Sequence, residues 1–415
     1  MFQKKLQQYA DLLVQVGINL QKDQTLVISA PIECADLVRL CAKSAYNAGC
    51  REVIVDWDDN DIKRQKFLYA DDDVFNSFPE WTRLLTQAST ADGTARLEFY
   101  VNDPHGMDGV LPDRIARFQK SKMAALQDSL TRMYSQEAPR CTASPVVLSW
   151  AKTVFPDYAD TDALNALWEI VFRALRIDGI HDSVKIWRDY FQTLQRRADY
   201  LNSLNLQTLH YKNSIGTDLT ISLPSGHIWE TSSTRTRSGH PYVCNLPSEE
   251  IYTVPHKNSA NGTLAGSIPL VYQGCLIRDF QFRFEDGVVA MASAKEGEDK
   301  LLSLLSVDEG ASRLGEIALV PNDAPIRRIG MPFFNPLYDE NASCHFALGQ
   351  GIVSSLENGN AMSQEELSTC GVNYSSIHLD FMIGTTDLSI TGITQCGKDI
   401  PIFINGQFAP QFPSK

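Results

Sequence analysis

The chain is acidic: its 415 residues include 50 Asp and Glu against 37 Lys and Arg, a net charge of −13. This excess of negative charge argues against nucleic acid or an anionic membrane as a partner. A hydrophobic content of 43% is ordinary for a globular protein, and no window of 18 uninterrupted apolar residues predicts a membrane span. The nine cysteines are scattered without a C-x-x-C pair, which predicts a reducing, cytoplasmic location rather than a disulfide framework.

The first half of the chain alternates strand-like and helix-like segments. Residues 1–17 predict an amphipathic helix rather than a signal peptide. Buried strands are expected at 24–31, 51–59 and 96–103, and the segment 34–50 has a helical pattern. This order predicts βαβ units around a parallel sheet. No G-x-G-x-x-G or Walker sequence follows these strands, so a nucleotide is not indicated.

The pattern changes after residue 160. Apolar residues recur at three- and four-residue spacing from 161 to 206, which predicts helices. The remainder is rich in short strand-like segments, at 217–224, 270–284, 287–294, 328–334 and 376–384. We therefore expect an α/β N-terminal domain with a helical connector over residues 1–205, and an α+β C-terminal domain over residues 206–415.

Two histidines of the second half lie in apolar, glycine-punctuated segments, His345 in ENASCHFALGQG and His378 in SSIHLDFMIG. Side chains alternate between the two faces of a strand, so His378 and Asp380 point the same way while Leu379 and Phe381 point into apolar packing. Either histidine alone is typical of a hydrogen-bonded core residue. The H-x-D pair favours a metal site, because imidazole and carboxylate are the usual donors to zinc, cobalt or manganese.

Three carboxylates in unusual settings add to this set. Glu250 opens an extended segment, Glu316 precedes the apolar run 317–320, and Glu340 lies in YDENASCH. For Glu249 a solvent-facing acid or a helix cap is expected. An unpaired carboxylate beside a buried apolar run, as at Glu316, is costly, and a metal would remove that cost.

The candidate metal ligands are therefore Glu250, Glu316, Glu340, His345, His378 and Asp380. These are too many donors for one tetrahedral zinc, and they suit two divalent ions that share a bridging carboxylate and a water or hydroxide. Such a pair suits hydrolysis of an amide or an ester. The same ligands would serve a dinuclear amidase or phosphoesterase, although few basic residues accompany them. Zinc, cobalt, manganese and magnesium are all compatible with these donors.

The candidate ligands lie in four segments, HPYVCNLPSEEIYTVPHK, RLGEIALV, YDENASCHFALG and HLDFMIG. These segments resemble the metal-binding segments of the thermophilic metallo-aminopeptidase family (aminopeptidase T, aminopeptidase S and PepS). LSWAKTVFP and LNALWEIVFRALRID resemble its middle part, so the resemblance covers most of the chain. It implies release of N-terminal residues from peptides by attack of a metal-bridged water or hydroxide. It also implies a homodimer with an enclosed interior that admits short peptides with a free N-terminus.

The resemblance carries over to individual positions. Five residues match the family's ligand positions and Glu340 matches a sixth; the five are Glu250, Glu316, His345, His378 and Asp380. Glu316 also matches the position with a catalytic role, either bridging the metals or handling the proton of the attacking water.

One position departs from the family pattern. Members usually carry a catalytic Tyr seven residues after the histidine of the H-x-A-x-G segment, where this chain has Ile352. Isoleucine cannot donate a hydrogen bond to a developing oxyanion. Gln350, Tyr338 and Tyr374 are nearby candidates to replace that donor; otherwise the enzyme is slow, or the protein is a metal-binding pseudo-peptidase or peptide-binding protein. Because the ligand set is intact, an active metallo-aminopeptidase is favoured.

Overall fold

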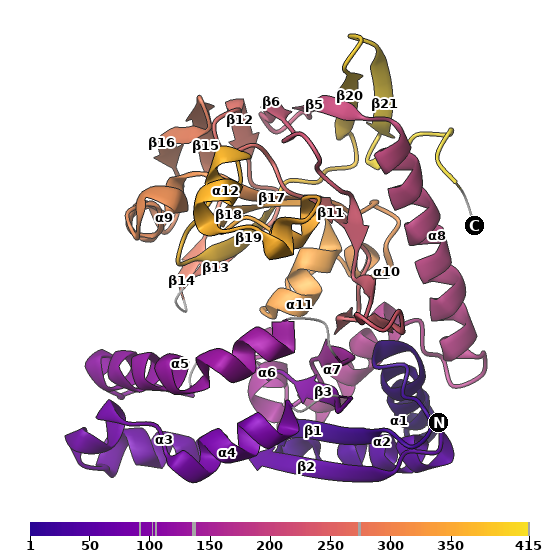
Figure 1. Cartoon of the computed structure of the whole chain (residues 1–415), viewed down its shortest axis with the longest axis vertical. Coiled ribbons are helices and arrows are strands. Elements are labelled where there is room, and N and C mark those ends of the chain that lie inside the picture. Colours follow the sequence, from indigo (N-terminus) through magenta and orange to yellow (C-terminus); the bar gives the residue numbers. More distant parts are fainter. Residues whose placement is uncertain (91–92, 102, 104–105, 135–137, 273–274, 414–415) are drawn as a thin grey trace. The chain divides into compact units, whose positions relative to one another are not determined.

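The computed structural model describes residues 1–90, 93–101, 103, 106–134, 138–272 and 275–413. The chain forms two compact units (Figure 1). Unit 1 comprises Met1–Arg188 and Ser233–Pro247, and unit 2 comprises Asp189–Ser232 and Ser248–Lys415. The mixed α/β content confirms the fold class in its coarse form. The domain division at residue 205 stays a prediction.

Unit 1 contains a parallel sheet with the strand order β10-β4-β3-β1-β2. β1 pairs in parallel with both β2 and β3, as the alternating pattern predicts. The expected strand at 96–103 is shorter than predicted, and its residue Asn102 lies outside the described residues. The strands are β1 (Thr25–Pro31), β2 (Glu52–Asp58), β3 (Ala95–Phe99), β4 (Arg140–Ala143) and β10 (Asn245–Leu246), with a separate hairpin of β8 (Ser233–Arg235) and β9 (Pro241–Val243).

The predicted N-terminal helix is present as α1 (Phe2–Leu12), which buries Leu6, Tyr9 and Leu12 on one side and continues as a π-helical turn. The other helices of unit 1 are α2 (Ala35–Asn47), α3 (Asn60–Tyr69), α4 (Glu80–Ser89), α5 (Pro112–Tyr134), α6 (Leu148–Val154) and α7 (Asp160–Ala174). α8 (Ser183–Ser203) begins in unit 1 and ends in unit 2. Among the described residues, no helix is both long and apolar enough to cross a membrane.

Unit 2 contains two large antiparallel sheets. The eight-stranded sheet has the order β16-β15-β12-β6-β5-β20-β21-β22, and the five-stranded sheet has the order β19-β18-β17-β11-β7. The first is formed by β5 (Leu206–Lys212), β6 (Asp218–Ser222), β12 (Asn261–Ala265), β15 (Gln281–Glu285), β16 (Val288–Ser293), β20 (Ser389–Thr394), β21 (Asp399–Ile404) and β22 (Gln407–Phe408). The second is formed by β7 (Glu230–Thr231), β11 (Ile251–Thr253), β17 (Leu314–Leu319), β18 (His345–Gly349) and β19 (His378–Met382).

Aromatic side chains fill the space between these two sheets. Tyr211 of β5 contacts Phe346 of β18, with ring centroids 5.0 Å apart, and Phe282 of β15 contacts Phe381 of β19 at 5.1 Å. Phe346 and Phe381 are directly paired across the strands. One face of β18 and β19 therefore packs into the core, and the alternate residues of both strands lie on the other face.

Short helices and a hairpin complete unit 2: α9 (Glu298–Leu305), α10 (Pro325–Ile329), α11 (Pro336–Asp339), α12 (Gln364–Thr369), β13 (Leu270–Tyr272) and β14 (Cys275–Ile277). The predicted strand at 270–284 is thus divided among β13, β14 and β15, and residues 273–274 lie outside the described part. The predicted strand at 328–334 is wrong. Arg328 and Ile329 complete α10, and Gly330 ends it in the left-handed conformation with φ 74°.

Candidate metal centre

Five of the six predicted ligands lie on or next to neighbouring strands of the five-stranded sheet, whose strands β11, β17, β18 and β19 are labelled in Figure 1. His378 and Asp380 lie on β19, His345 begins β18, Glu316 lies on β17, and Glu250 immediately precedes β11. In the β18–β19 register, Ala347 is opposite Asp380, and Gly349 is opposite His378. His345, His378 and Asp380 therefore lie on the face opposite to Phe346 and Phe381, as the period of two predicts for the H-x-D pair.

One group of potential ligands consists of Glu250, Glu316 and His345, whose ligand atoms lie within 4.8 Å of one another. The Nε2 atom of His345 is 3.3 Å from Oε2 of Glu250 and 4.0 Å from Oε1 of Glu316. All three residues are buried.

A second group consists of Glu316, His378 and Asp380. The Nε2 atom of His378 is 3.0 Å from Oε2 of Glu316 and 3.4 Å from Oδ1 of Asp380. Glu316 therefore belongs to both groups and presents one carboxylate oxygen to each imidazole. This is the arrangement expected of a carboxylate that bridges two metal ions.

The backbone orients both imidazole rings. His345 Nδ1–H donates to the carbonyl of Ser343 at 3.0 Å, and His378 Nδ1–H donates to the carbonyl of Gln350 at 2.8 Å. A carbonyl oxygen can only accept, so in both rings Nδ1 carries a proton, and Nε2 is the nitrogen that faces the carboxylates of the centre. Fixing a ligand imidazole by a hydrogen bond to its other nitrogen is the usual arrangement in metal sites.

The electrostatics of the centre are dominated by buried carboxylates. Burial raises the pKa of Glu316, and the nearby Asp380 and Glu250 raise it further against the opposing hydrogen bond from His378. Burial alone would lower the pKa of His345, but the negative charges of Glu250, Asp380 and Glu316 together outweigh burial and raise that pKa to about 10. The site therefore attracts positive charge, which a divalent cation would supply.

Asp380 provides a test of whether these residues fit a metal ion. Among the described residues, its Oδ1 atom is buried and makes no hydrogen bond, although Nε2 of His378 lies 3.4 Å away. An acceptor left in this way is costly unless a cation binds it. The nitrogen and oxygen donors around it are those that zinc, cobalt and manganese prefer. The residues present therefore fit a divalent metal site.

Glu340 lies close to this centre but belongs to neither ligand group among the described residues. Burial raises its pKa well above the usual range, and the negative charges of Glu250 and Asp380 contribute to that shift. The side-chain amide of Asn341 donates to Oε1 of Glu340 at 3.2 Å. Its role as a sixth ligand stays a prediction.

Sequence reasoning missed the supporting role of Asn341 and misplaced Glu249. Asn341 is fully buried; its Oδ1 accepts from the backbone N–H of Glu249 at 2.6 Å, and its Nδ2 donates to the carbonyl of Leu337 at 2.9 Å. The amide thus ties the segment of Glu250 to that of Glu340. Glu249 is fully buried, so the prediction of a solvent-facing position is wrong. No local pattern marks either residue, because both are buried by contacts between distant segments.

The structure places Ile352 beside β17, where its backbone N–H donates to the carbonyl of Gly315 at 3.4 Å. Of the three candidate donors, the Gln350 amide donates to the carbonyl of Gly351 at 3.0 Å and accepts from the backbone of Ser375 at 3.1 Å. Tyr338 is buried and stacks on Phe333. Tyr374 is 61% exposed. Gln350 and Tyr338 are thus held by their surroundings, and Tyr374 has the most freedom to move.

Comparison with known proteins assigns the chain to a family. A profile of the thermophilic metalloprotease (M29) family matches residues 2–408. Aminopeptidase 2 of Geobacillus stearothermophilus is 39% identical over 98% of both chains, and aminopeptidase AmpS of Bacillus subtilis is 38% identical over 98% of this chain and 99% of its own. The structure of wild-type AmpT from Thermus thermophilus superposes with a TM-score of 0.90 at 34% identity, covering 99% of this chain and 100% of that one.

These matches extend over nearly the whole chain and include every segment that contributes to the metal centre. The resemblance seen in the sequence is confirmed. The chain belongs to the thermophilic metalloprotease (M29) family.

Proposed function

We propose that the protein is a metal-dependent aminopeptidase that releases N-terminal residues from short peptides with a free N-terminus. The observation that carries this proposal is the position of Glu316, which is shared between two groups of nitrogen and oxygen donors. Relatives that match along the full chain are named aminopeptidases. We further propose a homodimer in the cytoplasm, with residues 206–415 as the catalytic domain.

In this proposal two divalent ions, zinc, cobalt, manganese or magnesium, would be held by residues on or next to adjacent strands. Glu250 and His345 would hold one ion, His378 and Asp380 the other, and Glu316 would lie between them, with Glu340 as a sixth ligand. Bound divalent ions would polarise the scissile carbonyl and lower the pKa of water.

The chain's own groups would supply positioning and proton handling. The carbonyls of Ser343 and Gln350 fix the two imidazoles, so the donor atoms are in place before substrate arrives. Glu316 is the residue proposed to take the proton of the attacking water.

The proposal is tested with leucine and arginine p-nitroanilides and protein stripped by a chelator. Turnover should be absent after stripping and should return on titration with one or more of zinc, cobalt, manganese and magnesium. Acetylating the substrate's α-amino group should abolish cleavage, because an aminopeptidase must recognise the free amine. Equal turnover of blocked and free substrates would contradict the proposal, and bound metal without turnover of any unblocked peptide would indicate a pseudo-peptidase.

A further inference from the structure

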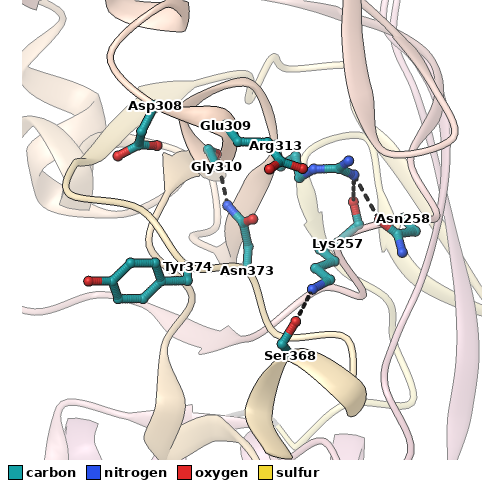
Figure 2. Close-up of a pocket in the computed structure, with 9 residues that line it drawn as sticks. All are labelled: Lys257, Asn258, Asp308, Glu309, Gly310, Arg313, Ser368, Asn373 and Tyr374. Carbon is teal, nitrogen blue, oxygen red and sulfur yellow. Dashed lines mark hydrogen bonds between the residues drawn. The ribbon is translucent and has the colours of Figure 1, made fainter. Parts of the chain in front are cut away.

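Unit 2 contains a cavity of about 490 Å³ that the metal ligands do not line. Figure 2 shows Lys257, Asn258 and Arg313 along one side and Tyr374 on the opposite side. The remaining lining residues are Asp308, Glu309, Gly310, Ser368 and Asn373. The volume is enough for the end of a short peptide.

The cavity lies at the end of the five-stranded sheet that is closest to His378. Arg313 immediately precedes β17, and Tyr374 lies shortly before β19. The Gly349 N–H, at the end of β18, donates to the Arg313 carbonyl at 2.8 Å, and Gly349 is paired with His378 across β19. The backbones of Arg313 and His378 are therefore two strand spacings apart, about 10 Å.

The cavity wall is also hydrogen-bonded to the strand that carries His345. The side-chain amide of Asn373, which is buried, donates to the carbonyls of Gly310 at 2.8 Å and Gly349 at 2.6 Å. Gln350, the next residue, is the one whose carbonyl orients His378. The end of β18 thus connects Asn373, which lines the cavity, to the carbonyl that orients His378.

Two cations line this cavity without a carboxylate partner among the described residues. Lys257 Nζ donates to the hydroxyl of Ser368 at 2.5 Å, and Arg313 Nη1 donates to Oδ1 of Asn258 at 2.7 Å and to the carbonyl of Lys257 at 3.2 Å. Both side chains are half-buried. A guanidinium and an ammonium that line the same cavity, each bonded to neutral partners, suit an anionic group.

Neither acid that lines the cavity forms an ion pair with Lys257 or Arg313 among the described residues. Both oxygens of Asp308 are already occupied, by Ala311 and Ser375 on one oxygen and by Ser376 on the other. Glu309 is exposed, so solvent screens its charge.

We propose that this cavity binds the C-terminal carboxylate of the peptide substrate, through Lys257 and Arg313. This inference rests on the proposed aminopeptidase function and names its substrate class: peptides that end in a free carboxylate. An extended chain covers about 3.3–3.6 Å per residue, so a span of about 10 Å corresponds to two or three residues after the scissile bond. Tripeptides and tetrapeptides with a free carboxylate would be the preferred substrates.

The test compares Leu-Gly-Gly with its C-terminal amide in the metal-loaded full chain. In the unmodified protein, kcat/KM for the free acid should exceed that for the amide by about tenfold, the usual scale of a charged hydrogen bond. In Lys257→Met and Arg313→Met the ratio should fall towards one. Lys300→Met, at an exposed position of α9, is the matched control and should keep the original ratio.

Equal kcat/KM for the acid and the amide in the unmodified protein would overturn the inference, and this comparison does not depend on whether a variant folds. An unchanged preference in both variants would also overturn it. Leucine p-nitroanilide has no carboxylate, so its turnover separates the two questions. If it is turned over and the acid and amide are equal, only the carboxylate site falls; if no unblocked substrate is turned over, the proposed function falls as well.

Discussion

Asp380 is the side chain whose surroundings call most directly for a cation, because its buried Oδ1 atom makes no hydrogen bond among the described residues. Asp380→Asn removes the negative charge while keeping the size. We expect the metal affinity to fall by at least about 10–100-fold, the range seen when only the support of a ligand is lost. Metal content after dialysis, measured by mass spectrometry, checks this. Asp399→Asn, at an exposed position of β21, is the control and should retain the metal.

Ile352 allows a second test at the level of a single side chain. Since the family resemblance implies a Tyr here, Ile352→Tyr should raise kcat by about tenfold or more, as one oxyanion donor is worth about 10²–10³ in rate. Ile352→Phe supplies the ring without the hydroxyl and should give no such gain. An equal gain from both variants would point to packing, and no gain from Tyr would mean that another group already donates.

At the scale of secondary structure, the approach of β17 to the end of β18 depends on Gly315. β17 is irregular between Leu314 and Glu316. A Cβ atom at Gly315 would lie 2.3 Å from the carbonyl oxygen of Gln350 and 2.5 Å from that of Gly349. The Gln350 carbonyl is the acceptor that orients His378. A side chain at this position would therefore displace a support of the metal centre.

We expect Gly315→Ala to weaken metal binding by about 10–100-fold through this displacement. Titration of the stripped protein with the activating metal gives the affinity. Gly397→Ala is a suitable comparison, because a Cβ there meets no atom within 4 Å. Although φ is 76° at Gly397, which adds backbone strain, that position should lose stability without loss of metal affinity. Equal metal affinity in Gly315→Ala and the unmodified protein would show that the strands can move apart freely.

Asp308 links two elements that frame the cavity. Its side chain caps the short helix at 309–312 and accepts hydrogen bonds from Ser375 and Ser376, ahead of β19. Three hydrogen bonds hold the pKa of Asp308 well below its usual range. They come from the hydroxyl of Ser376, the backbone N–H of Ser376 and the hydroxyl of Ser375. The ionised carboxylate is therefore the form that stabilises the folded state.

Asp308→Ala should lower the free energy of unfolding by about 1–2 kcal/mol at pH 7, the scale of a lost cap. A lowered folded-state pKa means that the stabilisation is fully present above the unfolded value of about 4 and is lost as the pH falls below it. The difference from the unmodified protein should thus shrink towards pH 3. Urea unfolding at the two pH values measures it, and a difference that grows on acidification would contradict the assignment.

At the scale of the whole molecule, all six proposed ligands lie in unit 2. A ligand that binds only the folded state stabilises it, by about 2.7 kcal/mol at a hundred times its Kd. Metal should therefore protect β17, β18 and β19 from amide hydrogen exchange while the parallel sheet of unit 1 changes little. Exchange followed by mass spectrometry, with and without chelator, checks this. Equal protection of both units would show that metal binding stabilises the chain globally.

Much of this architecture could be predicted from local patterns. The 3.6-residue and two-residue periods of apolar residues predict the parallel strands β1, β2 and β3 and the helices α7 and α8. They also predict the shared face of His378 and Asp380. The same patterns failed at 328–334, where apolar residues do not form a strand because Gly330 ends a helix. They also failed at Glu249, whose burial depends on Asn341, 92 residues away.

The sequence by itself determined the residue types available for chemistry, the local elements that carry them and, through its similarity to known segments, the family. Only the tertiary structure decided that Glu316 lies between two donor groups, which carbonyls orient the imidazoles, and that Lys257 and Arg313 share a cavity. The physical reason is the separation along the sequence. A periodic pattern of apolar residues determines the structure of a few neighbouring residues, whereas Glu250 and Asp380 are 130 positions apart. They are brought together by strand order and register, which depend on how the sheets pack.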